Sequence, residues 1–174
     1  MRKRLSNLQI VSALLLLALG VVGLRTHHID RHIWRAGRKN SVDPLLLRAV
    51  GITESRLNPK AVGAAGEIGM FQIMPNTAKH WAQKTDHKVP SEKQLFKLKV
   101  NANISAWYLR EGLDEFANKE DPTAYALAYY NAGPSRVRAW EDLQLPGIPF
   151  VEGIPFPSTR RYVTKILGIY RGGK

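Results

Sequence analysis

The chain has 174 residues, of which 44% are hydrophobic, and its formal net charge is +12 at pH 7. This length and composition suit one globular domain with its own core. The absence of cysteine excludes disulfides, thiol catalysis and thiolate metal sites. Because no zinc-finger spacing, RNA-binding signature or dense basic stripe with interleaved aromatic residues occurs, we expect no nucleic-acid partner.

The positive charge is concentrated near the N-terminus. Residues 1–39 carry eight Lys or Arg and one Asp, a net charge of +7, and residues 40–174 carry the other +5. Anionic lipid headgroups would attract the N-terminal excess. The remaining charge would suit an anionic polymer.

Residues 5–24 contain no charged residue and follow the basic residues 2–4. A secretory signal has an apolar core of ~7–15 residues, whereas a membrane-spanning helix needs ~20. We therefore expect residues 1–24 to form an N-terminal hydrophobic helix that serves as a signal anchor or transmembrane segment. Removal as a secretory signal, with cleavage near residues 18–20, is the alternative.

The next segment, residues 25–40, is basic and predicts a polar tether between the membrane and a folded domain at residues 41–174. Its histidines, His27, His28 and His32, could suggest a metal site. A membrane-proximal tether is the simpler interpretation, and we expect no metal site in the chain.

Residues 41–174 show the apolar periodicity of helices, with no strand alternation and no internal repeat. Asp43 and Pro44 predict a helix start, because Asp caps helices and Pro is tolerated at their first position, and Asn58-Pro59 predicts its end. Further helices are predicted at residues 77–83, 94–116, 121–130 and 135–142, followed by a loop at 145–157 and a final helix capped by Ser158. The pattern indicates an all-α fold, a compact bundle of short helices.

The first of these helices carries Glu54 on its apolar face. Leu47, Val50 and Glu54 lie on nearly the same face, and the positions four residues before and after Glu54 hold Val50 and Asn58, not a cation. Burial against apolar groups raises the pKa of a carboxyl group and keeps a proton available for a leaving group. Glu54 is therefore a candidate general acid, although from this helix alone a solvated glutamate at a helix end is the simpler interpretation.

A glycine-punctuated loop, residues 63–75, follows this helix. Gly66 and Gly69 permit backbone conformations that bring the chain close to a ligand. Gln72 can exchange hydrogen bonds with sugar hydroxyls or acetamido groups, and Phe71 and Met74 offer apolar surface for sugar faces. The alternative is a turn followed by core residues, which suits Phe71 equally well.

A third segment, residues 128–134, has the sequence AYYNAGP. The hydroxyl of Tyr130, if near Glu54, could orient the carboxyl group or the N-acetyl group of a substrate. Asn131 is a second candidate ligand contact, while helix C-capping by Asn131 and Gly133 is an equally good interpretation.

In this order and spacing, the three segments resemble the catalytic domain of soluble-type lytic transglycosylases, which are relatives of goose-type lysozyme. The resemblance covers roughly residues 41–170 and implies a lysozyme-like bundle of helices. It implies that Glu54 is the catalytic acid and that Ser55, its usual neighbour, contacts the substrate. The positions that match the family's glycan groove and its Tyr-Asn pair are Gln72, Met74, Tyr130 and Asn131.

Several positions depart from the family's pattern. Gly63 stands where Ser is frequent, and Glu67 stands where a small residue is common. Near the C-terminus, Ser158 replaces the acid of the family's Glu-Thr-Arg-x-Tyr-Val run, which puts any carboxylate role there in doubt. Tyr162 of that run is retained and could line the groove or belong to the core.

The resemblance implies a carbon–oxygen lyase, a peptidoglycan lytic transglycosylase that acts on glycan strands in cell-wall remodelling. Such an enzyme cleaves the bond between N-acetylmuramic acid and N-acetylglucosamine and leaves a 1,6-anhydromuramyl end. In this scheme Glu54 protonates the glycosidic oxygen, the substrate's acetamido group stabilises the cation, and Glu54 then takes a proton from the muramyl C6 hydroxyl. No metal or organic cofactor is implied.

Three other functions remain open, of which a basic membrane-surface protein with no glycan role is the weakest. A lysozyme-type peptidoglycan hydrolase would need a second carboxylate to activate water, for which Glu67 is the candidate. Another alternative is a non-catalytic wall-binding module of an envelope-spanning complex. The presence of an intact Glu54 argues against this alternative. A peptidoglycan substrate implies that residues 5–24 anchor the chain in a bacterial cytoplasmic membrane with the domain on the periplasmic side, or that the chain is secreted to the periplasm after signal cleavage.

Overall fold

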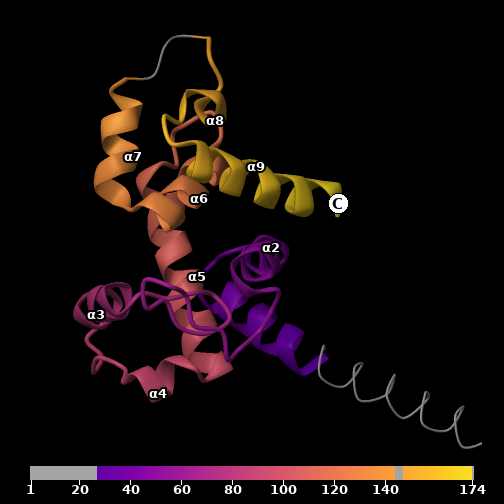
Figure 1. Ribbon diagram of the computed structural model, residues 1–174, viewed down its shortest axis with the longest axis vertical. Coiled ribbons are helices and arrows are strands. Elements are labelled where there is room, and N and C mark those ends of the chain that lie inside the picture. Colours follow the sequence, from indigo (N-terminus) through magenta and orange to yellow (C-terminus); the bar gives the residue numbers. More distant parts are fainter. Residues whose placement is uncertain (1–26, 144–146, 174) are drawn as a thin grey trace, which may run out of the picture.

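The computed structural model describes residues 27–143 and 147–173, and throughout these ranges the chain is predominantly helical (Figure 1). Residues 27–39 form a first helix. It is followed by α2 (Pro44–Ser55), α3 (Pro75–Lys84), α4 (Glu92–Leu95), α5 (Leu98–Glu115), α6 (Pro122–Ala132), α7 (Pro134–Glu141), α8 (Phe150–Gly153) and α9 (Pro157–Gly172). The only β pairing among the described residues is two isolated bridges, Val62 with Ile68 and Ile68 with Ile73. The predicted all-α fold is confirmed.

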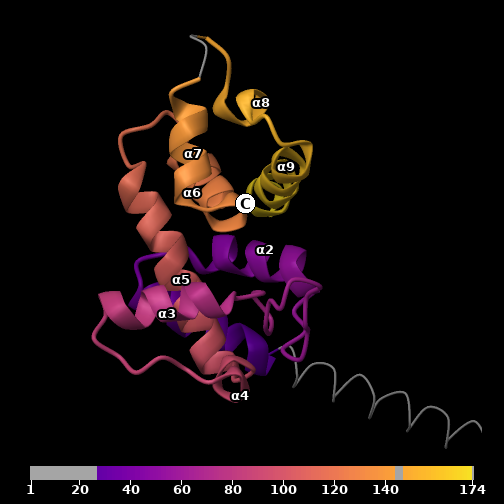
Figure 2. The same cartoon turned by 60° about the vertical axis from the view of Figure 1, so that its left-hand side comes forward.

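The long helix α5 connects two groups of helices (Figures 1 and 2). It packs against α3 and α4 in one group and against α6 in the other. The last helix, α9, packs against α6 and α8 and also against α2, so that it joins the two groups a second time. Because α2 carries Glu54 near its C-terminal end, the contact between α2 and α9 covers one side of that carboxyl group.

The predicted helix starts at the two Asp-Pro pairs are confirmed. At α2, the Asp43 carboxylate accepts a hydrogen bond from the Leu45 amide at 2.8 Å. At α6, the Asp121 carboxylate accepts one from the Ala124 amide at 3.2 Å. In both helices the proline that follows occupies the first turn, where its missing N–H leaves no hydrogen bond unmade.

Three predicted boundaries differ from the structure. The helix predicted at residues 94–116 is divided, because Lys97 takes an extended conformation between α4 and α5. The loop predicted at residues 145–157 contains the short helix α8. The final helix begins at Pro157, and the residue before it makes no side-chain capping bond, so Ser158 is not its cap.

The predicted tether at residues 25–40 is wrong for residues 27–39, which form a helix packed on the domain. Ile29, Ile33 and Ala36 lie on one face of this helix and belong to the same buried cluster as the rest of the core, with Ile33 fully buried. Asp30 also pairs with Arg48 of α2 at 3.0 Å. The charged residues of this segment lie on the helix face opposite its apolar residues. Its overall composition therefore did not indicate a helix that is buried on one side.

The predicted signal or anchor at residues 1–24 lies outside the described residues. Within residues 27–143 and 147–173, no helix has both the length and the apolar character needed to cross a bilayer.

Candidate active site

Glu54 lies near the C-terminal end of α2, where α9 packs against it. The hydroxyl of Tyr162, on α9, donates a hydrogen bond to Glu54 Oε1 at 2.6 Å. Glu54 is half-buried, so the carboxyl group has lost part of its contact with water. Sequence reasoning selected both residues, but not their contact.

The surroundings of Glu54 shift its pKa strongly. Burial is the largest cause and raises the pKa from 4.5 to about 7, because the ionised form loses hydration. The hydrogen bond from Tyr162 opposes this rise, and the negative charge of Glu67 adds to it. A carboxyl group with this pKa is about half protonated at neutral pH, so it can donate a proton and then accept one.

Ser55 connects α2 to the glycine-punctuated loop. Its hydroxyl donates to the carbonyl of Met70 at 2.7 Å and accepts from the amide of Asn58 at 2.9 Å. These two bonds hold the loop against the end of α2. The structure therefore gives Ser55 a positioning role beside Glu54, whereas the sequence had suggested contact with substrate.

Asn101 on α5 also holds this loop in place. This side chain is only 1% exposed; its Oδ1 accepts from the Phe71 amide at 2.8 Å and its Nδ2 donates to the Ile68 carbonyl at 2.9 Å. Gly69, with φ of +79°, approaches so closely that a Cβ there would lie 2.7 Å from Asn101 Nδ2. Sequence reasoning missed Asn101, although a polar residue on the buried face of a helix was the available signal.

The prediction that Phe71 contacts substrate is wrong, and the alternative of a core position holds. Its side chain has no exposed surface. It packs so closely on α2 that a Cβ on Gly51 would lie 3.0 Å from the Phe71 ring. Met70, the preceding residue, is fully buried as well, so this part of the loop belongs to the core.

Tyr130 on α6 binds the loop backbone. Its hydroxyl donates to the Phe71 carbonyl at 2.8 Å and lies 2.9 Å from Ser105 Oγ on α5. Burial raises the pKa of Tyr130 well above its ordinary value, and the negative charge of Glu54 raises it further. The Tyr130 hydroxyl therefore lies within the electrostatic influence of the Glu54 carboxyl group. The hydroxyl bonded directly to Glu54 is that of Tyr162, a role that the sequence analysis had suggested for Tyr130.

Glu67 and Gln72 converge on Gly63. A Cβ at Gly63 would overlap the Glu67 carboxylate and would lie 2.7 Å from Gln72 Oε1. Glu67 Oε2 also accepts a hydrogen bond from the Ala65 amide at 3.0 Å, and Gln72 Nε2 donates to the Gly69 carbonyl at 2.8 Å. The glycine at position 63, where the family frequently has serine, thus makes room for the carboxylate at position 67.

The other two candidates lie at the borders of helices. Met74 is half-buried and directly precedes α3. Asn131 is exposed; its Oδ1 accepts from Thr159 Oγ1 at 2.9 Å, which ties α6 to α9. The capping position of α6 is occupied by Gly133, with φ of +84°, and not by Asn131.

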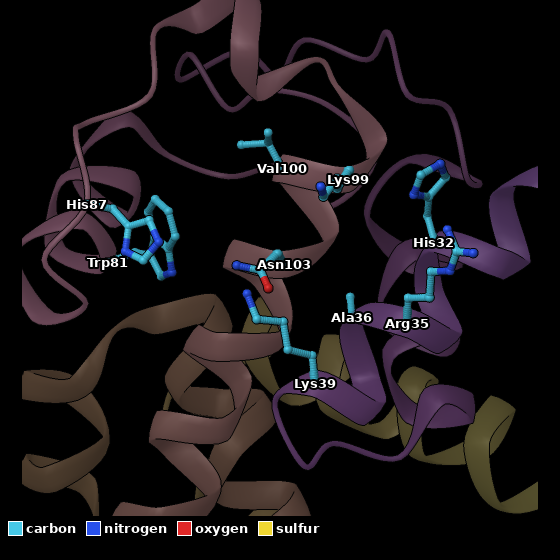
Figure 3. A pocket seen from close by; sticks show the side chains of 9 residues that line it. All are labelled: His32, Arg35, Ala36, Lys39, Trp81, His87, Lys99, Val100 and Asn103. Carbon is cyan, nitrogen blue, oxygen red and sulfur yellow. The ribbon is translucent and has the colours of Figure 1, made fainter.

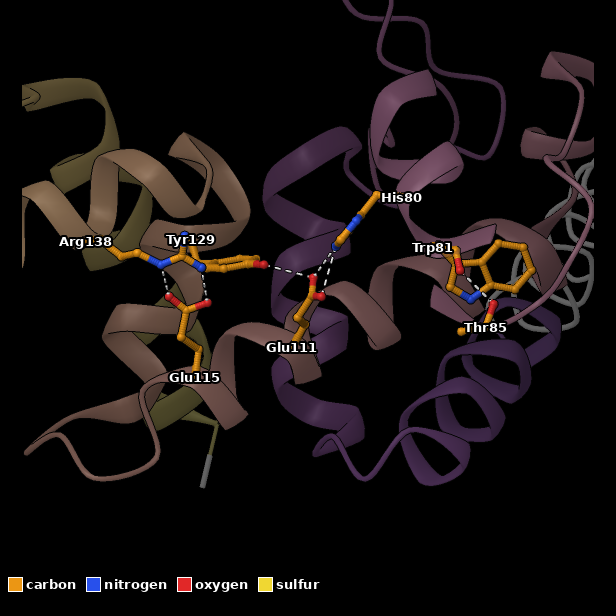
Figure 4. A network of polar contacts seen from close by, with 7 residues as sticks. All are labelled: His80, Trp81, Thr85, Glu111, Glu115, Tyr129 and Arg138. Carbon is orange, nitrogen blue, oxygen red and sulfur yellow. Dashed lines mark hydrogen bonds and ion pairs between the residues drawn. The ribbon is translucent and has the colours of Figure 1, made fainter. Parts of the chain in front are cut away.

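A second polar network, which the sequence analysis did not detect, connects α3, α5, α6 and α7 (Figure 4). Both carboxylate oxygens of Glu111 lie 2.9 Å from His80 Nε2, and the Tyr129 hydroxyl donates to Glu111 Oε2 at 2.9 Å. One turn further along α5, Glu115 receives two bonds from Arg138 at 2.6 and 2.8 Å. The carboxylates of Glu111 and Glu115 are thus both engaged with partners. Among the described residues, no group of three or more potential metal ligands occurs.

The domain is all-α, and beside its glycine-punctuated loop lies a half-buried carboxyl group with a raised pKa. These features define a lysozyme-like domain with one candidate acid. Comparison with known proteins makes this class more specific. Residues 31–145 match the family model of the Transglycosylase SLT domain, and the chain belongs to this family.

Curated and solved relatives agree with this assignment. The soluble lytic murein transglycosylase of Salmonella typhimurium is 36% identical over 139 residues, which are 76% of this chain and 21% of the relative. The crystal structure of the 70-kDa soluble lytic transglycosylase of Escherichia coli superposes with a TM-score of 0.74 at 33% identity, over 83% of this chain and 24% of that one. An inactive Glu-to-Gln mutant of the lytic transglycosylase Slt from Pseudomonas aeruginosa superposes with a TM-score of 0.69 at 29% identity, over 80% and 23%. The chain therefore spans about a quarter or less of these relatives.

Proposed function

We propose that this chain is a peptidoglycan lytic transglycosylase, which cleaves the bond between N-acetylmuramic acid and N-acetylglucosamine with formation of a 1,6-anhydromuramyl end. The observation that carries the proposal is the half-buried Glu54 carboxyl, whose pKa is raised to about 7. Its family membership and its similarity to proteins named lytic transglycosylases support the same activity. The inactive Glu-to-Gln mutant of the Pseudomonas relative is consistent with a glutamate as the acid.

The reaction needs one group that acts first as acid and then as base. Protonated Glu54 gives its proton to the glycosidic oxygen as the bond to the muramyl C1 breaks, and the substrate's acetamido group stabilises the cation at C1. Ionised Glu54 then removes the proton of the muramyl C6 hydroxyl, whose oxygen bonds to C1. Glu54 is reprotonated at the end, and no water is consumed.

The contacts of Glu54 suit both halves of this cycle. Burial keeps the proton on the carboxyl group at neutral pH before cleavage. The Tyr162 hydroxyl stabilises the carboxylate after the proton has left, because its hydrogen bond favours the ionised form. In this proposal Gln72, Met74 and Asn131 line the glycan groove, while Ser55 and Tyr130 hold the loop that carries Gln72.

A lysozyme-type hydrolase is the second candidate, because the charge of Glu67 reaches Glu54. Its carboxylate, however, is bonded to the Ala65 amide and enclosed at Gly63, which limits its freedom to activate water. A C6 hydroxyl of the substrate also has a large effective-concentration advantage over water once it is oriented.

Digestion of purified peptidoglycan separates the two candidates. The proposed lyase releases fragments that are lighter by one water than hydrolysis products and that borohydride does not reduce. The measurement is the mass of each fragment before and after borohydride treatment, with Glu54→Gln as the inactive control. Predominantly reducible fragments would contradict the lyase and make Glu67 the next residue to substitute.

We also propose that the domain acts outside the cytoplasm, held by residues 5–24 in the cytoplasmic membrane on the periplasmic side. The support is the uncharged run behind a basic N-terminus and the extracytoplasmic position of the substrate. Cell fractionation with N-terminal sequencing tests the anchor. A mature, unanchored protein that begins after residue 20 would replace the anchor with secretion to the periplasm.

A further inference from the structure

A cavity of about 480 Å³, whose lining does not include Glu54, lies between the helix at residues 27–39 and the N-terminal part of α5 (Figure 3). The end of α3 and the segment after it form the third wall. Its lining residues are His32, Arg35, Ala36, Lys39, Trp81, His87, Lys99, Val100 and Asn103. None of the residues that the proposed function uses is among them, so the cavity is a separate feature of the domain.

The lining is strongly basic. Arg35 and Lys39 come from the first helix and Lys99 from the start of α5, and none of the nine lining residues is acidic. None of these three cations forms an ion pair with a carboxylate in the described part of the chain. Three cations from two helices therefore share one cavity without an ion-pair partner among the described residues, which favours an anionic ligand.

The titration of His32 reflects the same excess of positive charge. Burial lowers the pKa of His32, and the nearby charges of His28, Arg31, Arg35 and Lys99 lower it further. No negative group contributes to this shift. An anion bound in the cavity would oppose these effects and raise the His32 pKa.

The remaining walls add a directed donor and an aromatic surface. Asn103 Oδ1 accepts a hydrogen bond from Asn40 Nδ2 at 3.3 Å, which turns its amide nitrogen away from Asn40. In Figure 3, Lys39 extends toward Asn103 in the middle of the cavity. On the opposite wall, the rings of Trp81 and His87 lie 4.8 Å apart, and His87 is exposed.

We propose that this pocket binds a phosphate group. A phosphate offers several acceptor oxygens and up to two negative charges, which matches several cationic donors and an amide donor that converge from different elements. A single carboxylate would leave most of these donors without a partner. The phosphate can belong to an anionic lipid headgroup or to a soluble phosphate compound.

The position of the pocket in the sequence is compatible with a lipid source. His32 lies eight residues after Leu24, the end of the uncharged segment. Eight residues span at most roughly 26–29 Å even when fully extended. If residues 5–24 lie in a bilayer, the pocket is within reach of the headgroup layer.

The test uses the full chain in micelles of a zwitterionic detergent. One arm adds inorganic pyrophosphate, and the other adds short-chain phosphatidylglycerol, with phosphatidylcholine as the neutral comparison. Binding is followed by NMR of the ring protons of His32 and His87. We expect a saturable change with at least one anionic probe, an increase in the His32 pKa, and no saturable change with phosphatidylcholine.

Two double variants of equal net charge distinguish a pocket from general attraction. Arg35→Gln with Lys99→Gln removes two lining cations and should weaken binding by about tenfold or more. Arg38→Gln with Lys97→Gln removes two exposed cations that do not line the cavity and should change binding by less than about twofold. Digestion of peptidoglycan by both variants should equal wild type, which confirms that they fold.

The outcomes assign the source or overturn the proposal. Saturation by pyrophosphate alone indicates a soluble phosphate compound, saturation by phosphatidylglycerol alone indicates a lipid headgroup, and saturation by both indicates recognition of the phosphate group itself. Absence of saturable binding with both anionic probes would overturn the phosphate site. Equal weakening in the two double variants would also overturn it, because the attraction would then belong to the whole basic surface.

Discussion

The hydrogen bond from Tyr162 offers a way to change the pKa of Glu54 without removing the acid. The Tyr162 Oη to Glu54 Oε1 distance is 2.6 Å, and a hydrogen bond to a charged group contributes about 1.5–3 kcal/mol. Because this bond favours the ionised form, Tyr162→Phe should raise the Glu54 pKa above its value of about 7. At about 1.36 kcal/mol for each pH unit, the expected rise is about one to two pH units.

The assay is the pH profile of kcat/KM for peptidoglycan digestion, whose alkaline limb reports the pKa of the acid in the free enzyme. For wild type this limb should lie near pH 7. Tyr162→Phe should move it to higher pH, and it should also lower the maximal rate, because the carboxylate formed after cleavage loses a stabilising bond.

Glu67→Gln provides a control of opposite sign. The negative charge of Glu67 raises the Glu54 pKa, so its removal should move the alkaline limb to lower pH. Limbs that move in the same direction in both variants would refute this account of the site. An alkaline limb that does not move in Tyr162→Phe would also refute it, because the group that titrates would then not be the carboxyl group bonded to Tyr162.

Three further predictions concern Glu54 and the loop beside it. Glu54→Gln should abolish cleavage and, by urea denaturation, should raise the free energy of unfolding by about 1–3 kcal/mol near pH 8 but not near pH 4. The sign follows because the folded-state pKa of about 7 exceeds the ordinary value of 4.5, so wild type loses stability as pH rises between these values; equal stability of the two proteins near pH 8 would contradict the raised pKa. Asn101→Ala should lower the free energy of unfolding by about 2–4 kcal/mol, since it leaves two buried backbone groups of the loop unpaired, and a loss within error in the same titration would show that water replaces the amide. Gly63→Ser should reduce digestion through overlap with Glu67, and the added change Glu67→Ala should restore it, whereas additive losses would argue against that overlap.

The features predicted correctly from the sequence depend on residues close together in the chain. The Asp-Pro pairs predicted two helix starts because a capping carboxylate bonds an amide two or three residues away. Glu54 was selected from the apolar face of its own helix and from the order of three short segments. A helix cap of this kind can be recognised in the sequence because its hydrogen bond is completed within a few residues.

The wrong predictions arose where distant packing decided the outcome. The helix at residues 27–39 was predicted to be a tether because of its positive charge. Its apolar stripe belongs to the core only through contact with a cluster formed by distant segments of the chain. For Phe71, the sequence favoured contact with substrate and a position in the core equally. The packing of α2 against its ring decides for the core.

The sequence by itself determined which carboxyl group is the candidate acid and that it lies on a helix followed by a glycine-punctuated loop. Only the tertiary structure decided that this group holds a proton near neutral pH. The pKa of Glu54 depends on desolvation where α9 packs against α2, and on a hydroxyl 108 residues away in the chain. Desolvation and long-range hydrogen bonds depend on distance in space, and no spacing in the sequence encodes that distance directly.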